Sequence, residues 1–217
     1  MTQTDERVRA RVDDVRLELV RLGSLVTGAV DAATAALTSG DLEEADRVIA
    51  DDDAVDAQRH SIEDDCLGLL GRSALAPAEL RFVVTTLRVA HELERTADLM
   101  VNVARTAWRL YPRVLVAPVP LLLDRLGRQV TLQLRLATNA FVDGDVAAAS
   151  ALDDMDDAVD ELHNALLRHA LDPVHRTSDA SVLEAVQLAL VARHYERAGD
   201  HTVTIAGWVP FVATGRR

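Results

Sequence analysis

The chain contains no lysine, and all 23 of its basic residues are arginine. This absence excludes a P-loop, whose lysine contacts nucleotide phosphates, and it excludes Schiff-base chemistry, which needs a lysine amine. The formal net charge of −12 argues against a nucleic-acid-binding surface, because such a surface needs clustered positive charge. We therefore expect no nucleic-acid partner.

Cysteine, aromatic residues and long apolar runs are also scarce. Cys66 is the only cysteine, so no disulfide can form within the chain, and its helical spacing from Ile62 and Leu69 predicts a buried, unreactive thiol. Aromatic residues make up 3% of the chain, so aliphatic side chains must fill the core. Because no uninterrupted apolar run approaches the roughly 18 residues of a membrane span and the first residues lack a signal-peptide pattern, we expect a cytoplasmic protein without membrane insertion.

Helical periodicity dominates what the sequence does contain. Six stretches carry apolar residues at helical spacing, and none shows the sustained alternation of a strand, which predicts an all-α fold. The expected helices cover about residues 5–37, 41–71 and 77–111 in the first half; after a proline-rich connector at 113–120, the next helix runs to about 142, another runs from the turn at 143–145 to 172, and the last covers 178–213. Short turns favour antiparallel neighbours, so we expect two tandem three-helix bundles, residues 1–112 and 118–217.

The two halves are copies of each other. Residues 93–98 and 195–200 share an E-x-x-x-D motif at an offset of 102 residues, and residues 52–56 and 156–160 share a D-x-x-x-D motif at an offset of 104. The turn at Gly40 likewise recurs at Gly144. An internal duplication explains these matches, with two residues lost from the second copy in a connecting turn.

The carboxylates of both motifs interrupt apolar helix faces. We call the stripe of apolar or small residues along one face of a helix its seam. Glu94 and Glu196 lie on the seams of the third and sixth helices, and Asp52 and Asp156 lie on the seams of the second and fifth helices. The seams of the second and fifth helices also contain Val48, Val55, Arg59, Ile62 and Cys66, and Leu152, Val159, His163, Leu166 and Ala170. Antiparallel packing should bring the four acids of each half into one layer.

Four converging carboxylates need compensation, because two like charges about 4 Å apart repel by roughly 4 kcal/mol at an effective dielectric constant of about 20. Protonation, arginine pairing and bound cations can each supply it. Small neighbours such as Ala97 and Gly199 favour cations, and all-oxygen ligation favours hard ions such as Mg²⁺, Mn²⁺, Ca²⁺ or iron. The candidate metal ligands are Asp52, Asp56, Glu94, Asp98, Asp156, Asp160, Glu196 and Asp200. Of the histidines, His91, His194 and His201 adjoin the motifs, yet we expect supporting or surface roles for all seven.

Residues 93–104 and 195–207 resemble the signature of the PhoU family, whose halves carry a Leu-Glu-Arg-Ile-Gly-Asp type sequence. The second copy is close to this pattern, whereas the first has Ala97 in place of the glycine and Leu99 after Asp98, which predicts an altered first site. The resemblance covers nearly the full chain. It implies a homodimeric cytoplasmic accessory protein that couples the ATPase of a phosphate ABC transporter to a sensor histidine kinase. It also implies negative regulation of the phosphate-starvation response, peripheral membrane association through the transporter, and iron or zinc clusters at the acidic motifs.

Two alternatives remain open, and we assign no catalytic residue and no organic cofactor. The first is a carboxylate-bridged metalloenzyme, although the chain lacks both the E-x-x-H motif of di-iron bundles and the H-E-x-x-H motif of zinc hydrolases. The second is a metal-free acidic module that docks arginine-rich segments of a partner. We expect a regulator rather than an enzyme.

Overall fold

The computed structural model describes residues 3–72, 74–175 and 177–215, and within these ranges it contains helices and no strand. The all-α prediction is therefore confirmed. The elements are α1 Gln3–Ser39, α2 Leu42–Arg72, α3 Pro77–Leu110, α4 Val119–Asp143, α5 Val146–Leu171, the short 3-10 helix η1 Pro173–His175, α6 Asp179–Gly207 and α7 Val209–Thr214.

Equivalent residues form the turns after α1 and α4. Gly40 and Gly144 have φ angles of 72° and 69°, a left-handed conformation that glycine adopts without a Cβ clash. The next residues, Asp41 and Asp145, each accept a 3.0 Å hydrogen bond from a backbone N–H three residues later and so cap α2 and α5. The duplicated glycine and aspartate thus specify the same turn twice.

The expectation that the sixth helix continues to 213 is wrong at one point, because α6 ends at Gly207 and the short α7 follows. Pro210 has no backbone N–H to donate to the carbonyl of Ala206, and its ring crowds that carbonyl. Trp208 instead donates to the carbonyl of Ile205 at 3.1 Å, which closes the last turn of α6 more tightly. The sequence contains the proline that causes this break.

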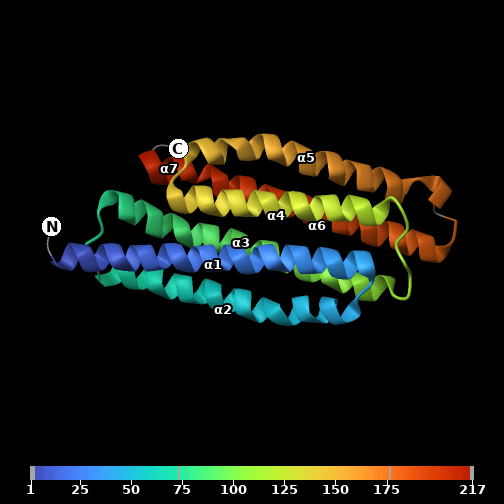
Figure 1. Cartoon of the computed structure of the whole chain (residues 1–217), viewed down its shortest axis with the longest axis horizontal. Helices are drawn as coiled ribbons and strands as arrows, with labels where there is room; N and C mark the ends of the chain where they lie inside the picture. Colours follow the sequence, from blue (N-terminus) through green and yellow to red (C-terminus); the bar gives the residue numbers. More distant parts are fainter. Residues whose placement is uncertain (1–2, 73, 176, 216–217) are drawn as a thin grey trace.

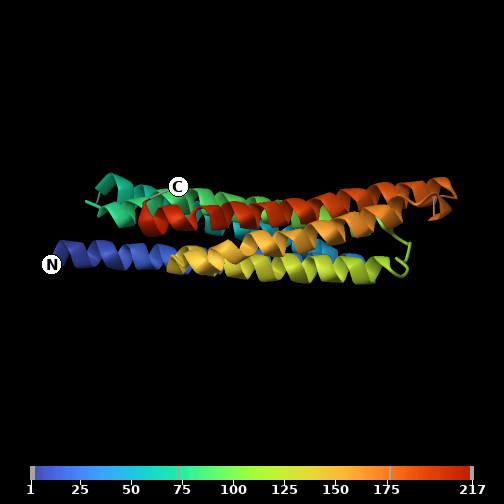
Figure 2. The same ribbon diagram turned by 90° about the horizontal axis from the view of Figure 1, so that it is seen from above.

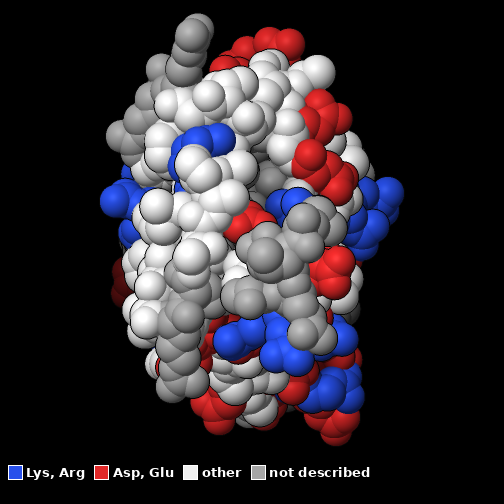
Figure 3. All heavy atoms as spheres, turned by 90° about the vertical axis from the view of Figure 1, so that its left-hand side faces the viewer, with Lys and Arg blue, Asp and Glu red and all other residues white. Residues whose placement is uncertain are grey.

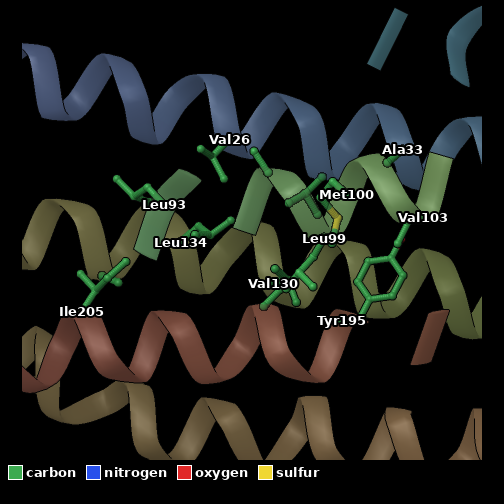
Figure 4. Close-up of a cluster of buried hydrophobic side chains, with 14 of the residues drawn as sticks. Val26, Ala33, Leu93, Leu99, Met100, Val103, Val130, Leu134, Tyr195 and Ile205 are labelled. Carbon is green, nitrogen blue, oxygen red and sulfur yellow. The ribbon is translucent and has the colours of Figure 1, made fainter. Parts of the chain in front are cut away.

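The halves pack side by side. Helices α1, α2 and α3 form one bundle and α4, α5 and α6 form the other, while α1 packs against α4 and α3 packs against α6. Figure 1 shows α2 and α5 at the outer edges, with the other four long helices between them, and Figure 2 shows α1 with α4 along one side of the molecule and α3 with α6 along the other. Figure 4 shows buried side chains from these four central helices, including Val26, Leu93, Val130 and Ile205, lying between the ribbons. The two predicted bundles thus share one continuous core.

The contact between α1 and α4 follows the duplication. A methyl group placed on Gly23 would lie 2.9 Å from Thr138, and one placed on Gly127 would lie 2.5 Å from Thr34. These two contacts are related by the same offset of 104 residues, so α1 and α4 meet through equivalent surfaces. The packing therefore has approximate two-fold symmetry, as in an isologous dimer.

Helix α1 meets a length and composition criterion for a membrane span over Glu6–Ser39, and half of its most apolar window is buried inside the protein. Buried core helices meet the same criterion, and Leu19, Leu22, Val26 and Val30 of this helix are fully buried.

At the end of the molecule seen in Figure 3, arginine side chains lie beside carboxylates. Opposite charges are thus interspersed on this face.

Candidate functional site

Each half carries one acidic cluster between its second and third helices. We define the first cluster as Asp52 and Asp56 of α2 with Glu94 and Asp98 of α3, and the second cluster as Asp156 and Asp160 of α5 with Glu196 and Asp200 of α6. The glutamate side chains are only 20% exposed in Glu94 and 17% exposed in Glu196, as the seam positions predict. Asp98, Asp160 and Asp200 are exposed.

The electrostatics of the first cluster indicate that its four acids lie close together. Burial raises the pKa of Asp52, and the charges of Asp98, Asp56 and Glu94 raise it further. Burial also raises the pKa of Glu94, with added contributions from Asp98 and Asp56. The carboxylates of α2 and α3 in the first half are thus near enough to disfavour one another's ionisation.

The second cluster repeats this arrangement more strongly. Burial raises the pKa of Asp156 to about 6, with further contributions from Asp160, Asp200 and Glu196. The pKa of Glu196 is raised by its burial first and then by Asp200. Because the ionised form is disfavoured by burial and by like charge, each cluster favours a proton, a cation or a basic side chain.

One arginine and one histidine act on the glutamate of each cluster, but the two residue types occupy swapped positions in the two halves. Near the first cluster, α2 supplies Arg59, which lowers the pKa of Glu94, and α3 supplies His91. At the equivalent positions of the second half, α5 supplies His163 and α6 supplies Arg193, and both lower the pKa of Glu196. The sequence predictions gave Arg193 no role and gave His163, like the other histidines, only a supporting or surface role. The seam position of His163 was the available signal.

Each glutamate has one buried oxygen that lacks a hydrogen-bond partner among the residues described. Arg193 forms an ion pair with Oε1 of Glu196, whereas Oε2 of Glu196 is unpaired. In the first half, Oε2 of Glu94 lies 3.4 Å from Nδ1 of His91, but the geometry does not make a hydrogen bond. Such oxygens are high-energy acceptors, because a buried polar group without a partner costs about 1–3 kcal/mol.

The donor chemistry of the clusters fits a hard cation, since each offers carboxylates and one buried oxygen without a partner. Within the described ranges, however, no three Asp, Glu, His or Cys side chains are placed to hold one ion together. Chelation by three or more cluster residues therefore requires side-chain rotamers that differ from those seen here. The assignment of metal ligands stays a prediction.

Of the histidines beside the motifs, one is buried and another is half-buried, His201 and His194 respectively. His201 is buried, and its Nδ1 lies 3.0 Å from Oγ1 of Thr96 in the other half, a hydrogen bond between α6 and α3. Burial lowers the pKa of His201 to about 4, and it also lowers the pKa of His194. His201 therefore joins the halves as a neutral side chain.

Cys66 is fully buried, and burial raises the pKa of its thiol to about 12. A thiol with this pKa carries little thiolate at neutral pH, so it is a poor nucleophile and metal ligand. The prediction that Cys66 is buried is confirmed, and the low reactivity of its thiol stays a prediction.

The fold and the two clusters define a duplicated all-α protein with one acidic site in each half. The sequence model of the PhoU domain matches the chain twice, over residues 19–107 and 123–209, and the chain belongs to the PhoU family.

Relatives with this domain align over most of their length. The phosphate-specific transport system accessory protein PhoU homolog 1 of Mycobacterium tuberculosis is 31% identical over 206 residues, which is 94% of this chain and 92% of the relative. PhoU of Serratia marcescens is 26% identical over 95% of this chain and 84% of its own. The crystal structure of PhoU from Pseudomonas aeruginosa superposes with a TM-score of 0.85 at 28% identity, covering 96% of this chain and 99% of that one.

Proposed function

We propose that this protein is a cytoplasmic negative regulator of phosphate uptake and phosphate-starvation signalling. It acts as an adapter between the ATPase of a phosphate ABC transporter and a sensor histidine kinase, it reaches the membrane peripherally through that transporter, and it is a homodimer. The observation that carries this proposal is the match of both halves to the PhoU domain. The similar proteins are named accessory proteins of the phosphate-specific transport system, and they align over nearly the full chain.

Reporter expression in a strain that lacks the gene tests the regulatory role. We expect alkaline phosphatase to be expressed at high phosphate in the deletion strain, and plasmid-borne wild-type protein to restore repression. Normal repression in a strain without a second copy of the gene would contradict the proposal. Pull-down of the transporter ATPase and of the kinase by the purified protein then tests the adapter role, and capture of neither would leave the adapter without its partners.

We further propose that the acidic clusters bind metal ions, with iron or zinc suggested by family resemblance and Mg²⁺ or Mn²⁺ by ligand chemistry. The unpaired buried oxygens of Glu94 and Glu196 support this, because a cation satisfies an acceptor that nothing else satisfies. Elemental analysis of protein purified without chelator tests it. Glu94→Gln with Glu196→Gln should lower the metal content, whereas the exposed control pair Asp53→Asn with Asp157→Asn should not.

The ion pair between Arg193 and Glu196 favours one second candidate, a metal-free acidic docking surface. A guanidinium from a partner can occupy a cluster as that of Arg193 does at Glu196. Partner capture in the presence of chelator separates the candidates. Binding that survives chelator and falls in the double glutamine variant supports docking, and binding that chelator abolishes supports the metal sites.

A further inference from the structure

An open groove of about 720 Å³ runs between α4 and α5, which lie side by side (Figure 1). None of its lining residues belongs to an acidic cluster. Leu122 and Leu132 of α4 both line the groove, so it extends roughly 15 Å along the helix. Leu132 is 55% exposed there, and α5 contributes the apolar side chains of Ala158, Leu162 and Ala165. The groove therefore combines open space with apolar walls.

Positive charge exceeds negative charge in this groove. Its lining includes one carboxylate, that of Glu161, and three guanidinium groups, those of Arg125, Arg128 and Arg168. Arg125 and Arg168 form no ion pair with any described residue. Arg128 pairs with Asp124 at 2.9 Å, but its side chain is 78% exposed, and ion pairs this exposed are weak. The groove is thus basic on a chain whose formal net charge is −12.

The equivalent positions of the first half lack this charge. At the offset of 104 residues, Ser24 stands in place of Arg128 and Asp64 stands in place of Arg168. Arg21, at the position of the remaining arginine, forms an ion pair with a glutamate of its own helix. The surplus of unpaired arginines between neighbouring helices is therefore a property of the second half alone.

We propose that this groove binds an acidic amphipathic helix of a protein partner. The apolar side of that helix lies on the leucines and alanines of the groove, and carboxylates along its edges pair with the three arginines, which is recognition of a helix in a groove. Guanidinium groups suit this role because they bind carboxylates through two parallel hydrogen bonds. The inference goes beyond the proposed metal sites and needs no metal at the acidic clusters.

Two other occupants fit the groove less well. A lipid surface does not follow a groove between two helices, and anionic headgroups repel a chain with a net charge of −12. A two-fold dimer centred on the groove would bring its arginines against those of the second copy, and like charges across an interface are unfavourable. A separate acidic helix meets neither obstacle.

Fluorescence anisotropy with a labelled synthetic peptide tests the inference. The probe is a helical peptide of about 15 residues, with leucines along one face and glutamates on both edges of that face. We expect its dissociation constant to lie in the micromolar range and to rise with salt, because partly exposed ion pairs are screened. A control peptide with glutamine in place of every glutamate should bind at least about tenfold more weakly.

Variants of the groove identify where the peptide binds. Arg128→Ser with Arg168→Asp gives the second half the residues of the first, and it should weaken binding of the glutamate peptide at least about tenfold. Both side chains are exposed, so the variant should fold. Arg7→Asp with Arg135→Ser changes the net charge equally at exposed positions outside the groove and should leave the affinity unchanged. Leu132→Asn should also weaken binding, whereas attraction by charge alone would not respond to it.

The opposing outcomes are distinct. Absence of peptide binding, or equal binding by the groove variant and its control, would overturn the inference. Sedimentation with phosphatidylglycerol vesicles that only the groove variant loses would assign the groove to a lipid surface. A change from dimer to monomer in that variant alone, measured by analytical ultracentrifugation, would assign it to a second copy. Either assignment also overturns the inference, and neither affects the metal sites or the regulatory role, which elemental analysis and reporter expression test separately.

Discussion

Two equivalent threonines should respond in opposite ways to the same substitution. Thr34 of α1 and Thr138 of α4 are related by the 104-residue offset, and both are buried at the contact between the halves. Oγ1 of Thr34 lies 2.6 Å from the hydroxyl of Tyr195, and it also donates to the carbonyl of Val30 at 2.7 Å. Thr34 therefore accepts from Tyr195, whose side chain is fully buried.

Thr138 has no such partner. The residue equivalent to Tyr195 at the 102-residue offset is Leu93, which has no hydroxyl, and Oγ1 of Thr138 is buried without a hydrogen bond to any described residue. Thr34→Val should cost about 1–3 kcal/mol, because it leaves the hydroxyl of Tyr195 buried and unsatisfied. Thr138→Val should be neutral or stabilise by up to about 1 kcal/mol, because it removes an unsatisfied hydroxyl and keeps the shape.

Guanidinium unfolding of both variants measures the contrast, and we expect their midpoints to move apart by the equivalent of about 2 kcal/mol. A double-mutant cycle of Thr34→Val with Tyr195→Phe should give a coupling of about 1 kcal/mol, whereas Thr138→Val with Tyr195→Phe should be additive. Equal losses in the two valine variants, or a larger loss at Thr138, would refute the reasoning. Either result would mean that the Thr34 hydroxyl is not the partner that Tyr195 requires.

Three further predictions concern Asp156, Gly127 and Cys66. Asp156→Asn should stabilise metal-free protein by about 1 kcal/mol at pH 8 and have little effect at pH 4, as measured by denaturant unfolding. The reason is that the pKa of this partly exposed group is raised to about 6 in the folded protein, so the stability contributed by its protonated form is lost as the pH rises through 6. A stabilisation by Asp156→Asn that grows toward pH 4 would contradict this reasoning. Gly127→Ala should destabilise by about 1–3 kcal/mol because its new methyl group meets Thr34, whereas the control Gly28→Ala, with open space around it, should stabilise by about 0.5–1 kcal/mol in thermal unfolding. Cys66 should react with a thiol reagent at pH 8 only after unfolding, and rapid reaction in the native protein, comparable with that of an exposed Ser61→Cys control, would show that this thiol is accessible.

The helices and the acidic layer could be predicted because their signals are local. Glycine, proline and aspartate mark most helix ends within a few residues, and helical spacing alone places Glu94 and Glu196 on buried faces. The antiparallel geometry of consecutive helices follows from short turns, so the convergence of Asp52 with Glu94 needed no other information. These predictions depend on neighbours in sequence.

The packing between the halves could not be predicted in the same way. The apolar seams of α1 and α4 indicate that these faces are buried against another helix. Which helix covers each face depends on how Gly23 and Gly127 fit the threonines of the opposite helix, and residue types alone do not specify that fit. Arg193 was missed as a neighbour of the second cluster for a related reason. Arg193 lies one turn before Glu196, and the direction of its long side chain is set by packing that spacing does not reveal.

Comparison of equivalent positions indicates where the two copies have diverged. The backbone turns and the acidic positions are retained in both halves, whereas polar contacts in the core are not. Tyr195 replaces Leu93, His201 replaces Leu99 and Gln133 replaces Ala29, so the added polar groups of these pairs all belong to the second half. A buried polar group costs free energy unless it is satisfied, which favours its retention where it fixes a particular arrangement. Tyr195 and His201 are satisfied by hydrogen bonds to the first half, and Gln133 alone retains an unpaired N–H among these three residues. That difference separates the two residues that join the halves from Gln133, whose hydrogen bond is to Thr202 of its own half.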